Sequence, residues 1–299
     1  MKIVFHFDGT HALRQRLEPL GVTLCPESDE TGFQRLLPEI EVLWHVLKPV
    51  TAAVIERAPK LRLIQKIGIG VNTIDVEAAK RRGIAVCNLP GSNSRAVAEM
   101  TLLLMLACLR RLPQLDDSVR SGDWQAAWEL QDAFGELNGR SVGLVGYGAV
   151  PRVLHPILEA LGAKVLFWSR SRRNAELDAL LAQADIVSLH LPLTAETRDS
   201  IDVRKMKPGS ILVNTARGGL VDEKTLLLAL ESGQLAAAGL DVFAEEPLPS
   251  GHPLLRLKNV VAAPHLAWLT RETLERSIEA ALRNIDRLQA GLPLESRVA

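Results

Sequence analysis

One segment, residues 141–173, constrains the fold of this chain more than any other. It reads as a short apolar strand, a tight glycine turn, a helix with leucine and isoleucine at helical spacing, and a second apolar strand. In such a unit Gly146 permits the tight bend, and Gly148 lets backbone N–H groups at the helix start approach a pyrophosphate. The segment therefore predicts a dinucleotide-binding unit, and a plain structural turn is the alternative.

Two prolines depart from the usual pattern of this unit, which is G-x-G-x-x-G. Pro151 stands where the third glycine is expected. A proline in the first helical turn loses only an N–H that has no helical partner, so the helix can still begin there. Pro156 removes a helical hydrogen bond to the carbonyl of Arg152, and we expect it to kink or displace the first turns.

The end of the second strand of this unit bears on the choice of cofactor. Chains that bind NAD carry Asp or Glu there for the ribose 2′-hydroxyl, whereas residues 169–173 of this chain read SRSRR. Hydroxyl and guanidinium groups suit a 2′-phosphate. We therefore expect Ser169, Arg170 and Arg172 to contact this phosphate and the chain to prefer NADP(H) over NAD(H), with a solvated turn as the alternative.

The rest of the chain alternates between apolar strands and helices, which favours two parallel α/β sheets. Strands of the first sheet are expected at residues 2–7, 22–25, 42–47, 61–67 and 85–88. Strands of the second sheet follow the opening unit at 186–190, 210–214, 235–242 and 260–263. Helices are expected at 11–20, 76–82, 95–111, 176–184, 223–231 and 271–290. Residues 123–138 hold two tryptophans but little periodicity, and we expect a surface connection there.

Two domains are expected from this alternation and from the chain length of 299 residues. A cluster rich in proline and glycine ends at Asn93 and marks a boundary. Residues 94–270 would form the cofactor domain. The last helix comes too late for the second sheet, so we expect it to return to the first domain, which would comprise residues 1–93 and 271–299.

Composition narrows the classes of function. The chain has 35 Lys and Arg residues and 35 Asp and Glu residues, so it carries no net positive charge that would favour nucleic acid as a partner. The three cysteines are widely spaced, which fits neither a disulfide framework nor a metal site, and we expect them to be reduced. The N-terminal apolar run is too short for a signal peptide, and no run is as long as a membrane span. We expect a cytoplasmic protein without a membrane segment.

Polar side chains follow three neighbouring strands of the second expected sheet, at the edge where ligands bind in doubly wound sheets. Arg217, Glu246 and His265 together suit reduction of a carbonyl beside a carboxylate. Arg217 would bind the carboxylate, His265 would give a proton to the developing alkoxide, and Glu246 would hold the imidazole and favour its protonated form. Each has an ordinary alternative: a surface ion pair, a solvated loop carboxylate and a loop histidine.

Long motifs run through the chain in order: IGIGVNTID (67–75), GIAVCNLPGSNSRAVAEMTLLLML (83–106), VGLVGYGAV (142–150), SLHLPLTAET (188–197), ILVNTARGGLVDE (211–223), AAGLDVFAEEPLP (237–249) and APHLAW (263–268). With these motifs the chain resembles the D-isomer-specific 2-hydroxyacid dehydrogenase family over nearly all of its length. The resemblance implies two doubly wound parallel-sheet domains, a Rossmann cofactor domain inserted in a flavodoxin-like substrate domain. It also implies a homodimer, with the helix that begins near Arg95 at the interface.

The resemblance also implies site residues, position by position. It implies Arg217, Glu246 and His265 as the catalytic set, and backbone N–H groups at Gly70 and Val71 as contacts for the substrate carboxylate. Contacts to NAD(P) would come from the glycine turn and from the strand ends: Gly146, Gly148, Ala149, Val150, Leu191, Pro192, Thr197, Thr215 and Asp241.

The substrate is less constrained. The His-x-Ala-Trp sequence at 265–268 resembles the glyoxylate and hydroxypyruvate reductase branch of the family. Glu246 disfavours the formate type, which has glutamine there, and Ile69 disfavours the phosphite type, which has lysine there. Lys48 is a candidate contact to the substrate tail, with a solvent-facing lysine as the alternative. Two further functions stay open: a dehydrogenase for 3-phosphoglycerate, and a dinucleotide-sensing, corepressor-like binding protein.

Overall fold

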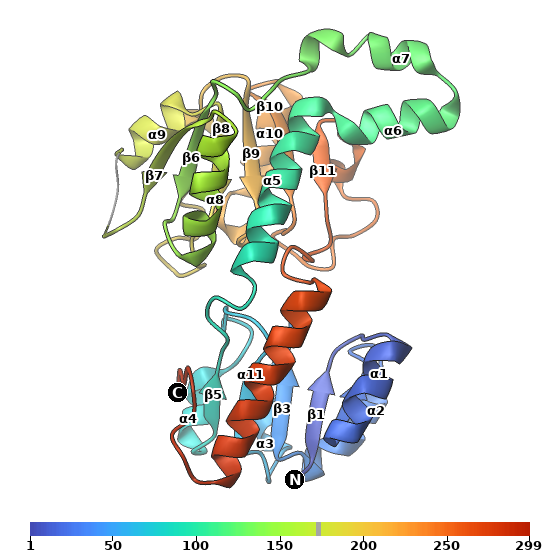
Figure 1. The fold of residues 1–299 in the computed structure, drawn as a ribbon, viewed down its shortest axis with the longest axis vertical. Helices are drawn as coiled ribbons and strands as arrows, with labels where there is room; N and C mark the ends of the chain where they lie inside the picture. Colours follow the sequence, from blue (N-terminus) through green and yellow to red (C-terminus); the bar gives the residue numbers. More distant parts are fainter. Residues whose placement is uncertain (172–174) are drawn as a thin grey trace. The chain divides into compact units, whose positions relative to one another are not determined.

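The computed structural model describes residues 1–171 and 175–299, and the chain divides into two compact units. Unit 1 comprises Met1–Asn93 and Thr270–Ala299, and unit 2 comprises Ser94–Leu269. Each unit contains a parallel sheet with helices on its faces, as the sequence predicts (Figure 1). Among the described residues, no helix combines the length and the apolar character that a bilayer crossing requires.

The sheet of unit 1 has five parallel strands in the order β2-β1-β3-β4-β5. This is the flavodoxin-like order. The strands are short and almost entirely buried, because helices cover a parallel sheet on both faces. Their bounds are β1 Ile3–His6, β2 Val22–Cys25, β3 Val42–His45, β4 Leu63–Lys66 and β5 Ala85–Cys87.

Helices pack on both faces of the unit 1 sheet. On one face, Phe33 of α2, Ile55 of α3 and Ala79 of α4 share a core with Ile64 of β4. The next residue of β4, Gln65, points to the opposite face, where its side-chain oxygen accepts a hydrogen bond from Asn284 of α11 at 2.8 Å. The C-terminal helix is therefore part of unit 1. The bounds are α1 His11–Leu17, α2 Glu30–Leu36, α3 Ala52–Glu56, α4 Val76–Arg81 and α11 Arg271–Gln289.

The sheet of unit 2 has six parallel strands in the order β11-β10-β9-β8-β6-β7. The order reverses at β6, with β7 on one side and β8 on the other, so the topological switch point lies between β6 and β8. Because all strands are parallel, their carboxyl ends share one edge. The bounds are β6 Ser141–Val145, β7 Lys164–Trp168, β8 Ile186–Leu189, β9 Ser210–Asn214, β10 Leu235–Leu240 and β11 Val260–Ala262.

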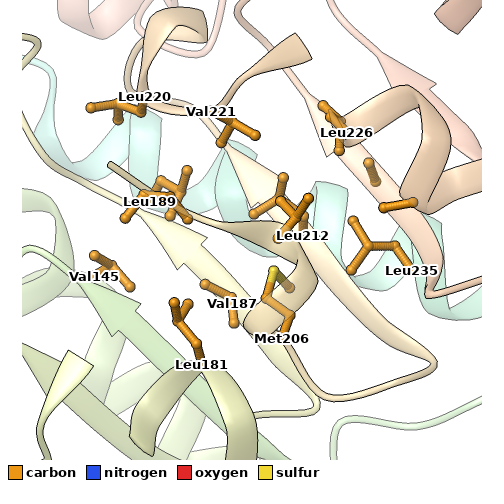
Figure 2. Close-up of a cluster of buried hydrophobic side chains, with 14 of the residues drawn as sticks. Val145, Leu181, Val187, Leu189, Met206, Leu212, Leu220, Val221, Leu226 and Leu235 are labelled. Carbon is orange, nitrogen blue, oxygen red and sulfur yellow. The ribbon is translucent and has the colours of Figure 1, made fainter. Parts of the chain in front are cut away.

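Four helices cover this sheet, α5 and α8 on one face and α9 and α10 on the other (Figure 1). Successive strand residues point to opposite faces, so Leu144 packs with the first pair of helices and Val145 packs with Leu181 of α9. Figure 2 shows the second cluster, which Leu220 and Val221 join from the segment after β9. This packing anchors that segment. The helices are α5 Ser94–Arg110, α8 Ala149–Ala160, α9 Leu177–Gln183 and α10 Glu223–Glu231.

The glycine turn and α8 are joined by side-chain contacts. Pro151 lies in the first turn of α8 and Pro156 in its interior, and the helix nevertheless runs as one segment of twelve residues. The expected disruption at Pro156 therefore does not divide the helix. The Tyr147 hydroxyl lies 2.7 Å from His155 Nδ1, and its ring stacks on Phe167 of β7 at 4.1 Å. These contacts tie the turn to α8 and to β7.

An arm of two short helices, α6 Leu112–Ser121 and α7 Trp124–Trp128, extends from the end of α5 away from the sheet of unit 2 (Figure 1). The surface connection expected at residues 123–138 thus includes a helix that the sequence pattern does not show. Asp123 caps this helix by accepting from the Ala126 N–H at 3.1 Å. A helix of five residues is too short to display a helical period.

Candidate active site

The glycine turn lies at the switch point of the unit 2 sheet. Gly146 has a φ of 98°, and a Cβ on it would lie 2.5 Å from the carbonyl oxygen of His190, so only glycine fits. A Cβ on Gly148, the N-cap of α8, would meet no atom within 4 Å. No side chain of the described chain caps this helix N-terminus, which Ala149 and Val150 begin. An open, uncapped helix start fits a dinucleotide pyrophosphate.

Other predicted cofactor residues lie along the same edge of the sheet. Leu191 and Pro192 follow β8, and the Thr197 hydroxyl donates to the Pro192 carbonyl at 2.6 Å, which fixes the loop. Thr215 follows β9, and its hydroxyl lies 2.9 Å from that of Thr101 in α5. The structure thus gathers these residues at the ends of two neighbouring strands. Their contacts to a cofactor stay a prediction.

Ser169 and Arg170 follow β7, at the position predicted for the 2′-phosphate. The Arg170 guanidinium lies 3.5 Å from the Glu196 carboxylate, and both side chains are 73% exposed. An ion pair this exposed contributes little to stability, so Arg170 can exchange Glu196 for a phosphate at low cost. Arg172, predicted for the same phosphate, falls within residues 172–174 and lies outside the described residues.

Arg217 lies at the start of the short 3₁₀ helix Gly218–Leu220, directly after β9. Asn214, the last residue of β9, shapes this turn. Its amide donates to the Arg217 carbonyl at 2.8 Å, and its side-chain oxygen accepts from the Ala216 N–H at 3.0 Å. Burial lowers the pKa of Arg217, and the negative charge of Glu246 opposes that change. A guanidinium remains charged in proteins, so this half-buried group suits a ligand carboxylate.

His265 and Glu246 form a close pair after β11 and β10. His265 Nδ1 lies 2.7 Å from one Glu246 oxygen, and the other oxygen accepts from the Phe243 N–H at 2.9 Å. Because a carboxylate only accepts, Nδ1 carries a proton and Nε2 is left to exchange a proton with a ligand. Burial would raise the pKa of Glu246, but the hydrogen bond and charge of His265, the Phe243 N–H and the charge of Arg217 lower it.

Asp241, at the end of β10, holds the backbone that carries His265. Its fully buried carboxylate accepts from the N–H groups of Leu266 and Ala267, each at 2.9 Å, and its carbonyl accepts from the His265 N–H at 2.8 Å. Burial raises the pKa of Asp241, and the two backbone hydrogen bonds oppose the rise. His265 has a φ of 57°, which is uncommon outside glycine. Asp241, predicted as a cofactor contact, positions the backbone of His265.

Gly218 permits a close approach of two loops, which sequence reasoning missed. A Cβ on Gly218 would lie 1.9 Å from the carbonyl carbon of Phe243, and both groups are backbone, so one loop would have to move. We expect Gly218→Ala to lower the free energy of unfolding by about 2 kcal/mol in urea denaturation. Gly219→Ala is the control, because the nearest atoms to its Cβ would belong to the flexible side chains of Leu193, at 3.2 Å, and Arg198, at 3.3 Å. Equal stability of the two variants would show that the approach is not tight.

The remaining predicted substrate residues lie in unit 1. Gly70 and Val71 follow β4. Lys48 follows β3, and its ammonium donates to the Glu27 carbonyl at 2.7 Å and pairs with the Glu30 carboxylate. The structure therefore places Lys48 in a local ion pair rather than facing solvent alone. Substrate contacts of these three residues stay predictions.

The cysteines offer neither a metal site nor a nucleophile. Cys25, Cys87 and Cys108 are buried and unbridged, and burial raises the pKa of Cys87 to about 11 and that of Cys108 to about 12. Among the described residues, no group of His, Cys, Asp and Glu is arranged to hold a metal ion.

The two parallel sheets, with a glycine turn at the switch point of one, define the class of dinucleotide-binding dehydrogenases. Residues 102–267 match the NAD binding domain of the D-isomer specific 2-hydroxyacid dehydrogenases. The chain belongs to the D-isomer-specific 2-hydroxyacid dehydrogenase family, and a nicotinamide dinucleotide is the cofactor class of that domain.

Individual relatives agree with this membership. A glyoxylate reductase of Korarchaeum cryptofilum is 40% identical over 281 residues, covering 89% of this chain and 85% of the relative. A hydroxypyruvate reductase of Blautia hydrogenotrophica is 33% identical over 297 residues, covering 93% and 92%. The crystal structure of the TT0316 protein from Thermus thermophilus superposes with a TM-score of 0.90 at 34% identity, over 100% of both chains.

Proposed function

We propose that this chain reduces small 2-oxoacids of the glyoxylate and hydroxypyruvate type to D-2-hydroxyacids. The observation that carries the proposal is the His265–Glu246 pair, in which the two side chains lie 2.7 Å apart. His265 follows β11 and Glu246 follows β10, and β10 neighbours β9, the strand that precedes Arg217. The similarity to a glyoxylate reductase and a hydroxypyruvate reductase supports this substrate class.

The three side chains have separate roles in this proposal. Arg217 binds the substrate carboxylate and polarises the neighbouring carbonyl. His265 donates the proton on Nε2 to the carbonyl oxygen as that oxygen becomes a hydroxyl. Glu246 orients the imidazole through Nδ1 and stabilises its protonated form. When bound, the dinucleotide supplies the hydride.

The proposed cofactor site uses the glycine turn for the pyrophosphate and the end of β7 for the ribose. Gly146 and Gly148 allow the close approach, and the N–H groups of Ala149 and Val150 face the phosphates. The absence of an acidic residue after β7 supports NADP(H) over NAD(H).

Arg170→Ala tests the cofactor preference. In the wild type we expect a higher kcat/KM with NADPH than with NADH. The variant loses a charge-assisted hydrogen bond to the 2′-phosphate, so its KM for NADPH should rise about tenfold. Its KM for NADH should stay within about twofold of the wild-type value, because NADH has no 2′-phosphate. Initial rates at varied cofactor concentration measure both values. Arg204→Ala, which removes an exposed arginine paired with Asp202, is the control. A wild type that clearly prefers NADH would contradict the proposal.

The reaction itself is tested with glyoxylate, hydroxypyruvate, phenylpyruvate and 3-phosphohydroxypyruvate, each with NADPH and NADH. We expect the highest kcat/KM with glyoxylate or hydroxypyruvate. The highest value with the phosphorylated substrate would favour a 3-phosphoglycerate dehydrogenase instead. Tight dinucleotide binding without turnover of any substrate would favour the dinucleotide-sensing alternative.

We further propose a homodimer built on the helical arm. Trp124 and Trp128 of α7 are 63% and 67% exposed, and apolar side chains of α6 are also half exposed. Large apolar side chains exposed on one short segment favour a protein interface, and a second copy would bury them. Light scattering should give twice the chain mass of 32.7 kDa, and the double variant Trp124→Ser/Trp128→Ser should be monomeric. Leu228→Ser, on α10, is the control, and a monomeric wild type would contradict the proposal.

A further inference from the structure

The loop that carries Glu246 has little apolar packing of its own. It follows β10 and leads into the short 3₁₀ helix Pro253–Arg256. Residues 244–247 are all exposed, whereas Phe243 packs partly against the core of unit 2. A loop of this kind is held by its polar contacts rather than by burial. The position of the Glu246 carboxylate therefore depends on where the loop is tied.

Glu223, the first residue of α10, contacts both ends of this loop. One carboxylate oxygen accepts from the Ala244 N–H at 3.4 Å, at the start of the loop. The other lies 3.0 Å from His252 Nε2, at its end, and both side chains are mostly buried, with 26% of Glu223 and 20% of His252 exposed. Glu246 lies between these two contacts. A single carboxylate thus bridges the segment that carries it.

The hydrogen bonds of His252 show which of its ring nitrogens donates to Glu223. The Leu254 N–H points to His252 Nδ1 at 3.4 Å, so Nδ1 acts as the acceptor. The ring proton then lies on Nε2, which donates to the Glu223 carboxylate. The neutral imidazole is sufficient for this hydrogen bond, and the charged form would strengthen it.

We propose that Glu223 and His252 form a clamp on the loop of residues 243–252, and that this clamp positions Glu246 for its contact with His265. The inference rests on the proposed function. Glu223 and His252 are positioning residues, because they reach the reacting groups only through the loop. The close approach of Gly218 to Phe243 fixes the loop start from the other side.

The clamp has a consequence for the hydrogen bond between His265 and Glu246. Asp241 holds the backbone of His265, whereas Glu246 is carried by the clamped loop. If the clamp opens, the 2.7 Å contact between His265 Nδ1 and the Glu246 carboxylate should lengthen while His265 stays in place. The Nδ1–H group then donates a weaker hydrogen bond, and the imidazole is oriented less well.

Glu223→Ala and His252→Ala test the clamp, and Glu231→Ala, at the exposed far end of α10, is the matched control. We expect each test variant to lower kcat for 2-oxoacid reduction about tenfold, with the dinucleotide Kd within about twofold. Because both remove the same bridge, the double variant should lose no more than either single one. His252→Gln keeps an N–H donor at the position of Nε2 and should recover most of the rate.

A second readout does not depend on turnover. NMR of nitrogen-labelled histidine, with the His265 signals identified by their loss in His265→Gln, should show the His265 Nδ1–H proton shifted upfield in both test variants, because its hydrogen bond to Glu246 is weaker, and unshifted in the control. An unshifted Nδ1–H signal in both variants, or losses of kcat that add in the double variant, would overturn the clamp. An unshifted signal counts against the clamp whether or not the wild type turns over a 2-oxoacid. A shifted signal without turnover counts only against the proposed function.

Discussion

His265→Gln is expected to lower kcat for glyoxylate reduction by about 10³-fold, the range found for loss of a positioned general acid. The glutamine side chain is close in volume to that of histidine, and its amide group reaches the position of Nε2 rather than that of Nδ1. The amide can donate a hydrogen bond to the substrate oxygen but cannot transfer a proton to it. What it lacks is a group that can carry and release a proton at the position of Nε2. The alkoxide that forms at the substrate carbon would then have to take its proton from water.

Steady-state kinetics and dinucleotide binding, measured on the same preparations, separate this loss from unfolding. The dinucleotide Kd, followed by the fluorescence of the bound reduced cofactor, should stay within about twofold of the wild type, because His265 is not among the proposed cofactor contacts. His11→Gln, an exposed histidine of α1, is the control. A variant with more than a tenth of the wild-type kcat would show that His265 is not the proton donor.

Arg217→Met is expected to lower kcat/KM by about 10³-fold, because two charge-assisted hydrogen bonds to the substrate carboxylate are together worth roughly 4 kcal/mol. Arg217→Lys should lose less, about 10²-fold, since the ammonium keeps the charge but not the planar pair of donors. The loss should appear in KM as well as in kcat, because Arg217 both binds the carboxylate and polarises the carbonyl.

The Arg217 series needs a control for charge alone. Arg204→Met removes an exposed arginine of unit 2 that pairs with Asp202, and it should leave kcat/KM within about twofold. A 2-oxoaldehyde, which has the carbonyl but no carboxylate, offers a complementary probe: the Arg217 variants should discriminate less between it and glyoxylate than the wild type does. If Arg217→Met retained full discrimination, the carboxylate would bind elsewhere.

Much of the fold can be predicted from the sequence, because buried parallel strands are continuous apolar runs. The strands at 22–25 and 210–214 and the helix at 223–231 have the predicted bounds. The helix expected at 11–20 ends as an α-helix at Leu17, because Pro19 follows and the chain continues as a 3₁₀ turn. Helices α2, α6 and α7 were not predicted. Helices α2 and α7 have seven and five residues, too few to display a clear period. Helix α6 begins directly after α5, and no side chain of the described residues caps its N-terminus, so no cap residue marks its start.

The candidate site, like the fold, could be predicted from the sequence only in part. Arg217, Glu246 and His265 could be proposed because strand ends of a parallel sheet share one edge, and the structure brings Glu246 and His265 into contact. The residues that hold these side chains in position could not be predicted from the sequence. Asp241 holds the His265 loop from 24 positions away in the sequence, and the bridge from Glu223 to the loop spans 21. Such contacts depend on how neighbouring loops fold over the sheet edge, which no local pattern encodes.

The central claim is that the site delivers hydride and proton to one face of a small 2-oxoacid. Hydroxypyruvate tests it most directly, because its reduction creates a new stereocentre. With NADPH as the hydride donor, chiral chromatography of the product should show D-glycerate alone. In His265→Gln the rate of D-glycerate formation should fall by the same factor as kcat. Formation of L-glycerate, or tight NADPH binding with no glycerate, would contradict it.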